Sequence, residues 1–471
     1  MERTVVSETI SHEGKKVKVQ GWVHSRRDHG KLIFIDLRDR SGLLQVVFWG
    51  GGDAVLFAQA DKLRSEFVVT ITGTVQKRGE NQVNAELPTG TVELAAETLE
   101  ILNESEVPAF EIEKATEVGE DRRMEYRYLD MRSERMRNNL EKRHKIIKLI
   151  RDELDQKGFW EIETPYLTKG TPEGAREFIV PARLSPGKFY VLPQSPQQFK
   201  QLLMVGGVEK YFQIARCFRD EDTRGDRQAE FTQLDLEMSF VEREDVMAIN
   251  EALLIKIVET LYPDKHIQKV PFPRMTYKEA MEQYGTDRPD IRENKEDPNL
   301  LAFMWVIDFP FFEKTDKEEH HGAEGEWTFT HNPFSAPIPE HTDKLMAKAG
   351  IGEILTTQYD VVLNGSEIGG GSIRNHKPEA LRKVLEIIGH KPENIERDFG
   401  HMLKAFAYGA PPHGGIAWGL ERLVMILQNE PSIRDVMAFP KTGDSRDLLM
   451  QAPNDVNPKT LKELGIKVEE Q

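Results

Sequence analysis

Short runs in which apolar and polar residues alternate dominate the first hundred residues of the chain. Such alternation is typical of half-buried β-strands. The runs cover 17–23, 32–37, 43–48, 67–75 and 92–102, and a helical stretch at 53–63 separates the third run from the fourth. Five short strands with one helix after the third predict an OB-fold barrel.

Such a barrel binds single-stranded nucleic acid when aromatic rings and basic side chains share its surface. Candidates for that surface are Trp22, His24, Arg26, Arg27, His29 and Phe34. A purely structural barrel is the alternative, and composition does not decide between the two. The net charge of −16 argues against a protein whose whole surface binds nucleic acid, but it allows a local basic face.

The segment after the barrel has the Pro, Glu and Ala content of a hinge. We therefore predict a barrel domain over 1–103, a hinge over 104–130 and a second domain over 131–471. In the second domain, apolar residues at helical spacing predict helices over 139–157, 244–261, 277–284 and 420–427. Predicted strands cover 211–218, 231–240, 358–363, 367–371 and 414–418.

The predicted hairpin formed by 211–218 and 231–240 encloses a loop rich in charges of both signs. A solvated surface hairpin is one explanation of these charges. The other is an ATP site, because the charges flank Phe218 and Phe231, whose rings could stack on a planar base. Arginines of the loop would then bind phosphate, since guanidinium groups form strong paired hydrogen bonds with anions.

A second group of candidates follows the tight-turn signal Asn364-Gly365. Asp360 and Glu367 come from neighbouring predicted strands, so their carboxylates could hold a divalent cation that also contacts phosphate. A structural salt bridge explains the same residues equally well. Further along, Arg422 lies in the first turn of a predicted helix, where it would favour anions or simply pair with Glu421.

Five stretches of the chain, in order, resemble the class II aminoacyl-tRNA synthetases of the aspartyl type. The segment FRDED…RQ.EFTQLD.E within 218–237 resembles motif 2, GFWEIETP at 158–165 resembles motif 1, and GIAWGLERLVMIL at 415–427 resembles motif 3. TPEGAREF at 171–178 and QSPQQFK at 194–200 resemble aspartyl-type signatures. The resemblance implies an α+β protein, with an N-terminal OB-fold barrel and a catalytic domain built on an antiparallel sheet flanked by helices.

The resemblance also implies the reaction and its nucleotide site. Aspartate would attack the α-phosphate of ATP, and the aspartyl group would then pass to tRNA. Since two anions meet in the first step, the protein must supply positive charge and alignment. Matched residue by residue, Arg219 would clamp the α-phosphate and Phe231 would stack on adenine, while Arg422 would hold the γ-phosphate. Glu221 and Gln228 would help to place the nucleotide, and Asp360 and Glu367 would hold Mg²⁺.

The amino-acid site follows in the same way. Lys200 and Arg374 match the cations that hold the side-chain carboxylate in aspartyl enzymes, and a planar Arg fork suits a carboxylate. The ammonium group would be bound by Glu173, Ser195, Gln197 and Asp235. His331 matches a family histidine near the substrate, whereas Asn332 stands where many bacterial members have a second histidine.

The resemblance assigns anticodon recognition to the barrel, with Arg26, Arg27, His29 and Phe34 as the predicted residues. Members that charge both tRNA-Asp and tRNA-Asn often have His rather than Leu after Arg-Arg-Asp, and here that residue is His29. The chain departs from the bacterial pattern by lacking a large insertion between Arg292 and Trp305. A homodimer is implied by the resemblance alone.

Two alternatives to this interpretation make different predictions about the sequence. A non-catalytic RNA-binding relative would be expected to lack Arg219, Glu367 or Arg422, and all three are present. A relative specific for asparagine or lysine is disfavoured by QSPQQFK together with Arg374. No apolar run approaches the ~20 residues of a membrane span, so no membrane association is expected. The one cysteine, Cys217, and the non-apolar N-terminus fit a reducing cytoplasm.

Overall fold

The chain forms two compact units in this computed structural model, which describes residues 1–170, 174–221, 227–315 and 325–469. The first unit comprises Met1–Gly119 and Tyr128–Ser133, and the second comprises Glu120–Arg127 and Glu134–Gln471. The predicted hinge at 104–130 contains three short helices and contributes residues to both units. These helices are η3 (Ile112–Glu117), α2 (Glu120–Glu125) and α3 (Arg127–Asp130).

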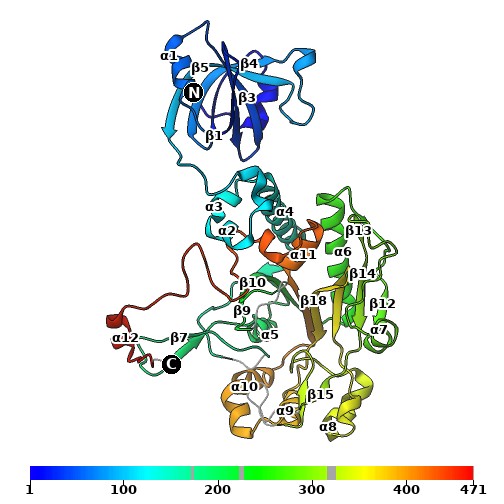
Figure 1. The fold of residues 1–471 in the computed structure, drawn as a ribbon. Helices are drawn as coiled ribbons and strands as arrows, with labels where there is room; N and C mark the ends of the chain where they lie inside the picture. Colours follow the sequence, from blue (N-terminus) through cyan, green and yellow to red (C-terminus); the bar gives the residue numbers. More distant parts are fainter. Residues whose placement is uncertain (171–173, 222–226, 316–324, 470–471) are drawn as a thin grey trace. The chain divides into compact units, whose positions relative to one another are not determined.

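The first unit contains a closed five-stranded barrel in the order β1-β2-β3-β5-β4 (Figure 1). Its strands are β1 (Lys16–Asp28), β2 (Leu32–Asp39), β3 (Gly42–Trp49), β4 (Val68–Lys77) and β5 (Val92–Asn103). The helix α1 (Ala54–Asp61) follows β3, and the short helices η1 (Val6–His12) and η2 (Glu80–Gln82) also belong to this unit. Alternate residues such as Val19, Ile35 and Ile71 are buried in the barrel core, as the alternation predicts. The predicted OB-fold is confirmed.

The second unit is built on an eight-stranded sheet in the order β12-β14-β17-β18-β19-β10-β9-β6 (Figure 1). The strands are β6 (Trp160–Glu161), β9 (Lys210–Phe218), β10 (Glu230–Ser239), β12 (Arg274–Thr276), β14 (Phe303–Ile307), β17 (Tyr359–Leu363), β18 (Ser366–Ile373) and β19 (His413–Gly419). The six central strands are antiparallel, while β12 and β6 run parallel to their neighbours. The predicted α+β class with a mainly antiparallel sheet is confirmed.

One face of this sheet is covered by three helices, α4 (Glu134–Gln156), α6 (Arg243–Leu261) and α11 (Leu420–Leu427). Their apolar residues form one core with those of β10 and β19. Helix α4 begins five residues before the predicted start at Asn139, because Met136 is buried and Arg135 pairs with Glu430. Polar residues lie on the opposite face of the sheet.

Helices and small sheets surround the large sheet. The helices are α5 (Gln197–Val205), α7 (Tyr277–Tyr284), α8 (Thr342–Ala347), α9 (Pro378–Ile387), α10 (Pro392–Phe406), α12 (Pro458–Leu464), η4 (Pro339–His341), η5 (Ile351–Glu353) and η6 (Ile433–Val436). The two-stranded sheets pair β7 (Ile179–Pro181) with β8 (Phe189–Val191), β11 (His266–Ile267) with β13 (Leu300–Leu301), and β15 (Phe312–Lys314) with β16 (Trp327–Phe329). Among the described residues, no helix is long and apolar enough to cross a membrane.

The turn between β17 and β18 confirms the sequence signal at Asn364-Gly365. Both residues have positive φ, 49° for Asn364 and 82° for Gly365, as the tightest hairpin turns require. The turn folds β18 back along β17, so that the Glu367 strand lies beside the Asp360 strand.

Candidate active site

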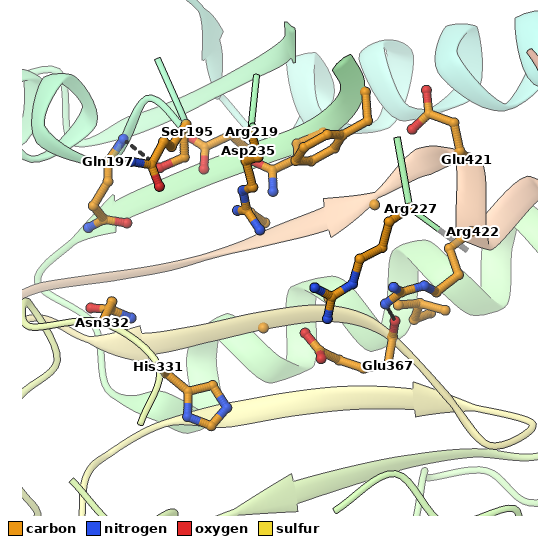
Figure 2. Close-up of a pocket in the computed structure, with 18 of the residues that line it drawn as sticks. Ser195, Gln197, Arg219, Arg227, Asp235, His331, Asn332, Glu367, Glu421 and Arg422 are labelled. Atoms are coloured by element: carbon orange, nitrogen blue, oxygen red, sulfur yellow. Dashed lines mark hydrogen bonds between the residues drawn. The ribbon is translucent and has the colours of Figure 1, made fainter. Parts of the chain in front are cut away.

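A cavity of about 510 Å³ lies on the sheet face opposite to α4, α6 and α11 (Figure 2). Its walls come from α5, the β9–β10 hairpin, the segment 330–334, β18 and the β19–α11 junction. The residues predicted for the amino-acid and nucleotide sites line it as a group: Ser195, Gln197, Lys200, Arg219, Glu221, Gln228, Phe231, Asp235, His331, Glu367, Arg374 and Arg422. Asp360 is not in the lining, and Glu173 lies outside the described residues.

Strand β10 divides its side chains between the core and the cavity. Leu234, Leu236 and Met238 are packed in the core, whereas the intervening Gln233 and Asp235 line the cavity together with Phe231. This division follows from the two-residue period of a strand. The polar face of β10 is therefore the floor of the cavity.

A buried group of four charges lies on that floor. The Lys200 ammonium nitrogen is 2.6 Å from Asp235 Oδ1 and 3.2 Å from Glu237 Oε2. Arg374 donates from Nε and Nη2 to the two oxygens of Glu237, at 2.9 and 3.1 Å. The side chains of all four residues are at most 2% exposed, so each charge depends on the others for its stability.

The two carboxylates of this group differ in protonation behaviour. Burial raises the pKa of Asp235, because Lys200 offsets only part of the desolvation. Burial would also raise the pKa of Glu237, but Arg374 and Lys200 outweigh it and hold that pKa below its usual value. Asp235 Oδ2 is buried and accepts no hydrogen bond within the described part of the chain, so it is the oxygen left for a bound cation such as an ammonium group.

Arg219 lies where β9 ends, with its guanidinium carbon 5.1 Å from the centre of the Phe231 ring. Its Nε is buried and donates to no acceptor among the described residues. A buried guanidinium nitrogen that lacks an acceptor is stabilised by an anion, so this group fits a phosphate or carboxylate ligand. Gln228, in contrast, bonds through its side-chain amide to the backbone N–H and C=O of Lys441, at 2.8 and 3.0 Å.

The carboxylates on β17 and β18 form a second negative region. Burial raises the pKa of Glu367, and the nearby Asp360 charge raises it further. His331 Nε2 lies 3.2 Å from Asp360 Oδ2, and Gln358 donates from Nε2 to Asp360 Oδ1 at 2.7 Å. Within the described ranges no three His, Cys, Asp or Glu side chains form a complete metal site. Two neighbouring carboxylates nevertheless fit Mg²⁺, which keeps several water ligands and binds phosphate as well.

Arg422 enters the cavity from the first turn of α11, as the sequence predicted for its position. Its Nη1 donates to the backbone carbonyl of Glu367, so motif 3 is tied to β18. Arg422 and Glu367 lie at one end of the cavity, and Ser195 and Gln197 lie at the other (Figure 2). Candidates for the amino-acid site and for the nucleotide site thus occupy opposite ends of one cavity.

The barrel carries a separate cavity of about 220 Å³, whose lining includes Arg27, Gln45 and Arg78. Arg26 points elsewhere and forms an ion pair with Asp61. The rings of His29 and Phe34 contact each other edge to face at 5.6 Å between centroids, outside the lining of this cavity. Of the four residues predicted to bind the anticodon, only Arg27 therefore lines it.

Comparison with known proteins identifies the family. Residues 119–443 match the family "tRNA synthetases class II (D, K and N)", and 17–102 match "OB-fold nucleic acid binding domain". The chain is 40% identical to the aspartate–tRNA(Asp/Asn) ligase of Halothermothrix orenii, over 100% of this chain and 99% of that protein. It is 41% identical to that of Rubrobacter xylanophilus, over 97% and 95%. The chain belongs to the aspartate–tRNA ligase family of class II synthetases. The predicted enzyme class is thereby confirmed.

Solved structures of other class II synthetases share the fold. Asparaginyl-tRNA synthetase from Pyrococcus horikoshii, complexed with asparaginyl-adenylate, is 24% identical with a TM-score of 0.75, over 94% of this chain and 98% of that chain. Aspartyl tRNA synthetase from Entamoeba histolytica is 23% identical with a TM-score of 0.73, over 93% and 91%. These similarities establish the architecture. The amino-acid specificity must be inferred from the residues of the site.

The synthetase is shorter than its curated relatives. The alignment with the Halothermothrix orenii enzyme runs over 597 positions, although this chain has 471 residues. Long gaps must therefore fall where the relative has residues that this chain lacks. Between Arg292 and Trp305, where the sequence predicts that an insertion is missing, the structure has only residues 293–304, which include β13 and the first residues of β14.

Several lining residues of the synthetase were not predicted from sequence. Glu421 accepts hydrogen bonds from the Thr232 backbone N–H and from Arg143, and Gln358 holds Asp360. Arg227 also lines the cavity and pairs with Glu221. The contacts of Glu421 join residues that are far apart in the chain. Gln358 lies outside the motifs that carry the family resemblance. Glu237 continues the polar series of Gln233 and Asp235 on β10, but the sequence did not show that it pairs with Lys200 and Arg374 beneath the cavity.

Arg143→Met is expected to lower the free energy of unfolding by about 3 kcal/mol. Its Nη2 lies 2.8 Å from Glu421 Oε1, and the Glu421 side chain is 4% exposed, so the variant leaves a buried carboxylate without its cation. Urea denaturation followed by fluorescence measures the loss. A change below about 0.5 kcal/mol, the range of ordinary surface substitutions, would contradict this role.

Proposed function

We propose that this enzyme activates L-aspartate with ATP and Mg²⁺ and transfers the aspartyl group to tRNA-Asp and also to tRNA-Asn. The observation that carries the choice of amino acid is the buried group of Lys200, Asp235, Glu237 and Arg374 on the cavity floor. Aspartate offers one ammonium group and two carboxylates. The buried group offers two cations beside Asp235, whose Oδ2 accepts no hydrogen bond from the described residues.

In the first step, a substrate carboxylate oxygen attacks the α-phosphorus of ATP, and pyrophosphate leaves with the electron pair of the broken P–O bond. Arg219 lies between the amino-acid and nucleotide ends, so it would hold the α-phosphate and the attacking carboxylate together. Phe231 would stack on adenine, and Arg422 would hold the γ-phosphate. No side chain of the enzyme needs to act as a nucleophile.

Asp360 and Glu367 would hold Mg²⁺, whose charge, when it is bound, offsets that of the phosphates. Gln358 would keep Asp360 in place through its hydrogen bond to Oδ1. In the second step, a terminal ribose hydroxyl of tRNA attacks the aspartyl carbonyl and loses its proton, and AMP leaves. The OB-fold barrel would bind the anticodon, with Arg27 at its cavity and the rings of His29 and Phe34 on its surface.

Asparagine activation is the alternative within this fold, since asparaginyl enzymes share it. An amide side chain would leave the two cations without an added negative charge, which favours aspartate. A non-catalytic RNA-binding protein is disfavoured, because Arg219, Glu367 and Arg422 all line one cavity.

The enzyme is proposed to work as a homodimer in the cytoplasm. The sheet edge at β6 supports this, because Trp160 there is 64% exposed and Leu167 beyond it is 55% exposed. Large exposed apolar side chains at a sheet edge favour association. Analytical ultracentrifugation should give twice the mass of the chain, and a monomer at micromolar concentration would contradict the proposal.

Charging of tRNA-Asn tests the dual specificity. With purified transcripts, the enzyme is expected to charge both tRNA-Asp and tRNA-Asn with aspartate. His29→Leu is expected to lower the kcat/KM for tRNA-Asn about tenfold relative to that for tRNA-Asp, a change worth about 1.4 kcal/mol. Failure of the unaltered enzyme to charge tRNA-Asn while it charges tRNA-Asp would restrict the proposal to a discriminating enzyme.

A further inference from the structure

A chain of hydrogen bonds runs from the edge of the amino-acid site into the protein. Gln197, at the start of α5, donates from Nε2 to Gln201 Oε1 one turn later, at 3.1 Å. Gln201 Nε2 lies 3.0 Å from His413 Nε2, and His413 Nδ1 lies 2.7 Å from the carbonyl oxygen of Pro411. Gln201 and His413 are fully buried, and Gln197 is 8% exposed and lines the cavity.

The direction of each hydrogen bond in this chain is fixed by its last member. A carbonyl oxygen only accepts, so His413 must carry its hydrogen on Nδ1. Burial lowers the pKa of His413, although Glu237 opposes this, so the ring is neutral near pH 7 and Nε2 has no hydrogen. The ring's other charged or titratable neighbours, Arg374 and His376, both favour the neutral form.

The same argument fixes the orientation of the two glutamine side chains between His413 and the cavity. Because His413 Nε2 accepts, Gln201 must present its NH₂ group to the ring and its oxygen to Gln197. Gln197 must then present its own NH₂ group to Gln201. Its remaining group, Oε1, makes no hydrogen bond within the described part of the chain.

We propose that Gln201 and His413 are positioning residues that keep the Gln197 side-chain oxygen available to the ammonium group of the bound amino acid. This inference rests on the proposed function, in which Gln197 binds that group. If the chain were broken, the Gln197 amide could turn over and present N–H hydrogens to the ammonium. A favourable hydrogen bond to a charge would then become a repulsive contact.

The test uses Gln201→Met in the full-length enzyme, because Met has a similar length and no amide. In aspartate-dependent ATP–pyrophosphate exchange, the KM for aspartate should rise between about tenfold and a hundredfold, with kcat nearly unchanged. Succinate is aspartate without its amino group, so its inhibition constant should not change. The readout is therefore the ratio of the aspartate KM to the succinate inhibition constant.

Two further variants distinguish positioning from general damage. Gln198→Met makes the same substitution at the next residue of α5, which is also buried but pairs with His401 instead, so the ratio should stay at its original value. His413→Phe keeps a ring against Phe406 and removes both nitrogens, so it should reproduce the effect of Gln201→Met. The double variant should show no larger effect than either single one, because both break one chain.

The inference is overturned if Gln201→Met and His413→Phe leave the ratio unchanged, or if the binding of aspartate and the binding of succinate weaken equally. It is also overturned if the effects of the two single variants on the ratio add in the double variant. Should one variant fail to fold, the other is judged by the same ratio. Absence of aspartate-dependent exchange in the unaltered enzyme would instead refute the proposed function and this inference with it. If both variants support exchange and keep the original ratio of the aspartate KM to the succinate inhibition constant, the inference is refuted while the proposed function stands.

Discussion

Arg374→Met is expected to reduce aspartate activation on the order of a thousandfold and to lower the free energy of unfolding by about 4 kcal/mol. Arg374 supplies two hydrogen bonds to Glu237, at 2.9 and 3.1 Å, and is one of two cations proposed for the substrate side chain. Its loss leaves Glu237 buried with Lys200 as its remaining cation, while Lys200 also serves Asp235. Exchange kinetics and urea denaturation measure the two effects.

A double variant separates binding from stability. In Glu237→Met/Arg374→Met, the buried ion pair is replaced by apolar side chains of similar length, and such replacements are often neutral for stability. The free energy of unfolding should return to within about 2 kcal/mol of its original value. Aspartate activation should stay lost, because the substrate carboxylate still lacks its cation. Recovery of activity along with stability would show that Arg374 serves folding alone.

Arg219→Met is expected to lower the kcat of aspartate-dependent exchange on the order of a thousandfold, with little change in stability. The guanidinium has a buried Nε without an acceptor, and it forms no ion pair with a carboxylate among the described residues, so its removal leaves none of those carboxylates without a partner. Single-turnover formation of aspartyl adenylate measures the chemical step directly. A normal rate of adenylate formation would remove Arg219 from the proposed mechanism.

Arg216→Met is the matched control for this variant. Arg216 lies three residues earlier on β9, where it pairs with Glu230 and donates to Thr232 Oγ1 at 3.0 Å. It does not line the cavity. Its removal should leave exchange within about threefold of the original rate, because the Glu230 side chain is 33% exposed and keeps water as a partner.

The elements that position the site could be predicted from local sequence. The sequence predicted the strand over 231–240, whose alternating apolar and polar residues separate the two faces of β10, and Asn364-Gly365 identified the turn that joins β17 to β18. Both signals depend on one or two neighbouring residues, through the period of a strand and the positive φ of a tight turn. The resemblance then named residues that the structure brings to one cavity.

The pairing of charges inside the site could not be predicted in this way. Lys200 and Asp235 were each assigned to a different part of the substrate, yet their side chains contact each other at 2.6 Å. Arg143 and Glu421 meet although 278 positions separate them. Such contacts depend on how distant elements pack, and no local period or motif records them. The orientation proposed for Gln197, which begins α5, likewise depends on His413, which begins β19.

The most direct test of the central claim is ATP–pyrophosphate exchange with the purified enzyme and Mg²⁺, with aspartate, asparagine and lysine in parallel. If the buried charges on the cavity floor select a substrate carboxylate, aspartate alone should support exchange. Asparagine should be at least about a hundredfold less efficient in kcat/KM, since its amide adds no negative charge between Lys200 and Arg374. Comparable exchange with asparagine, or exchange with lysine instead of aspartate, would contradict the account.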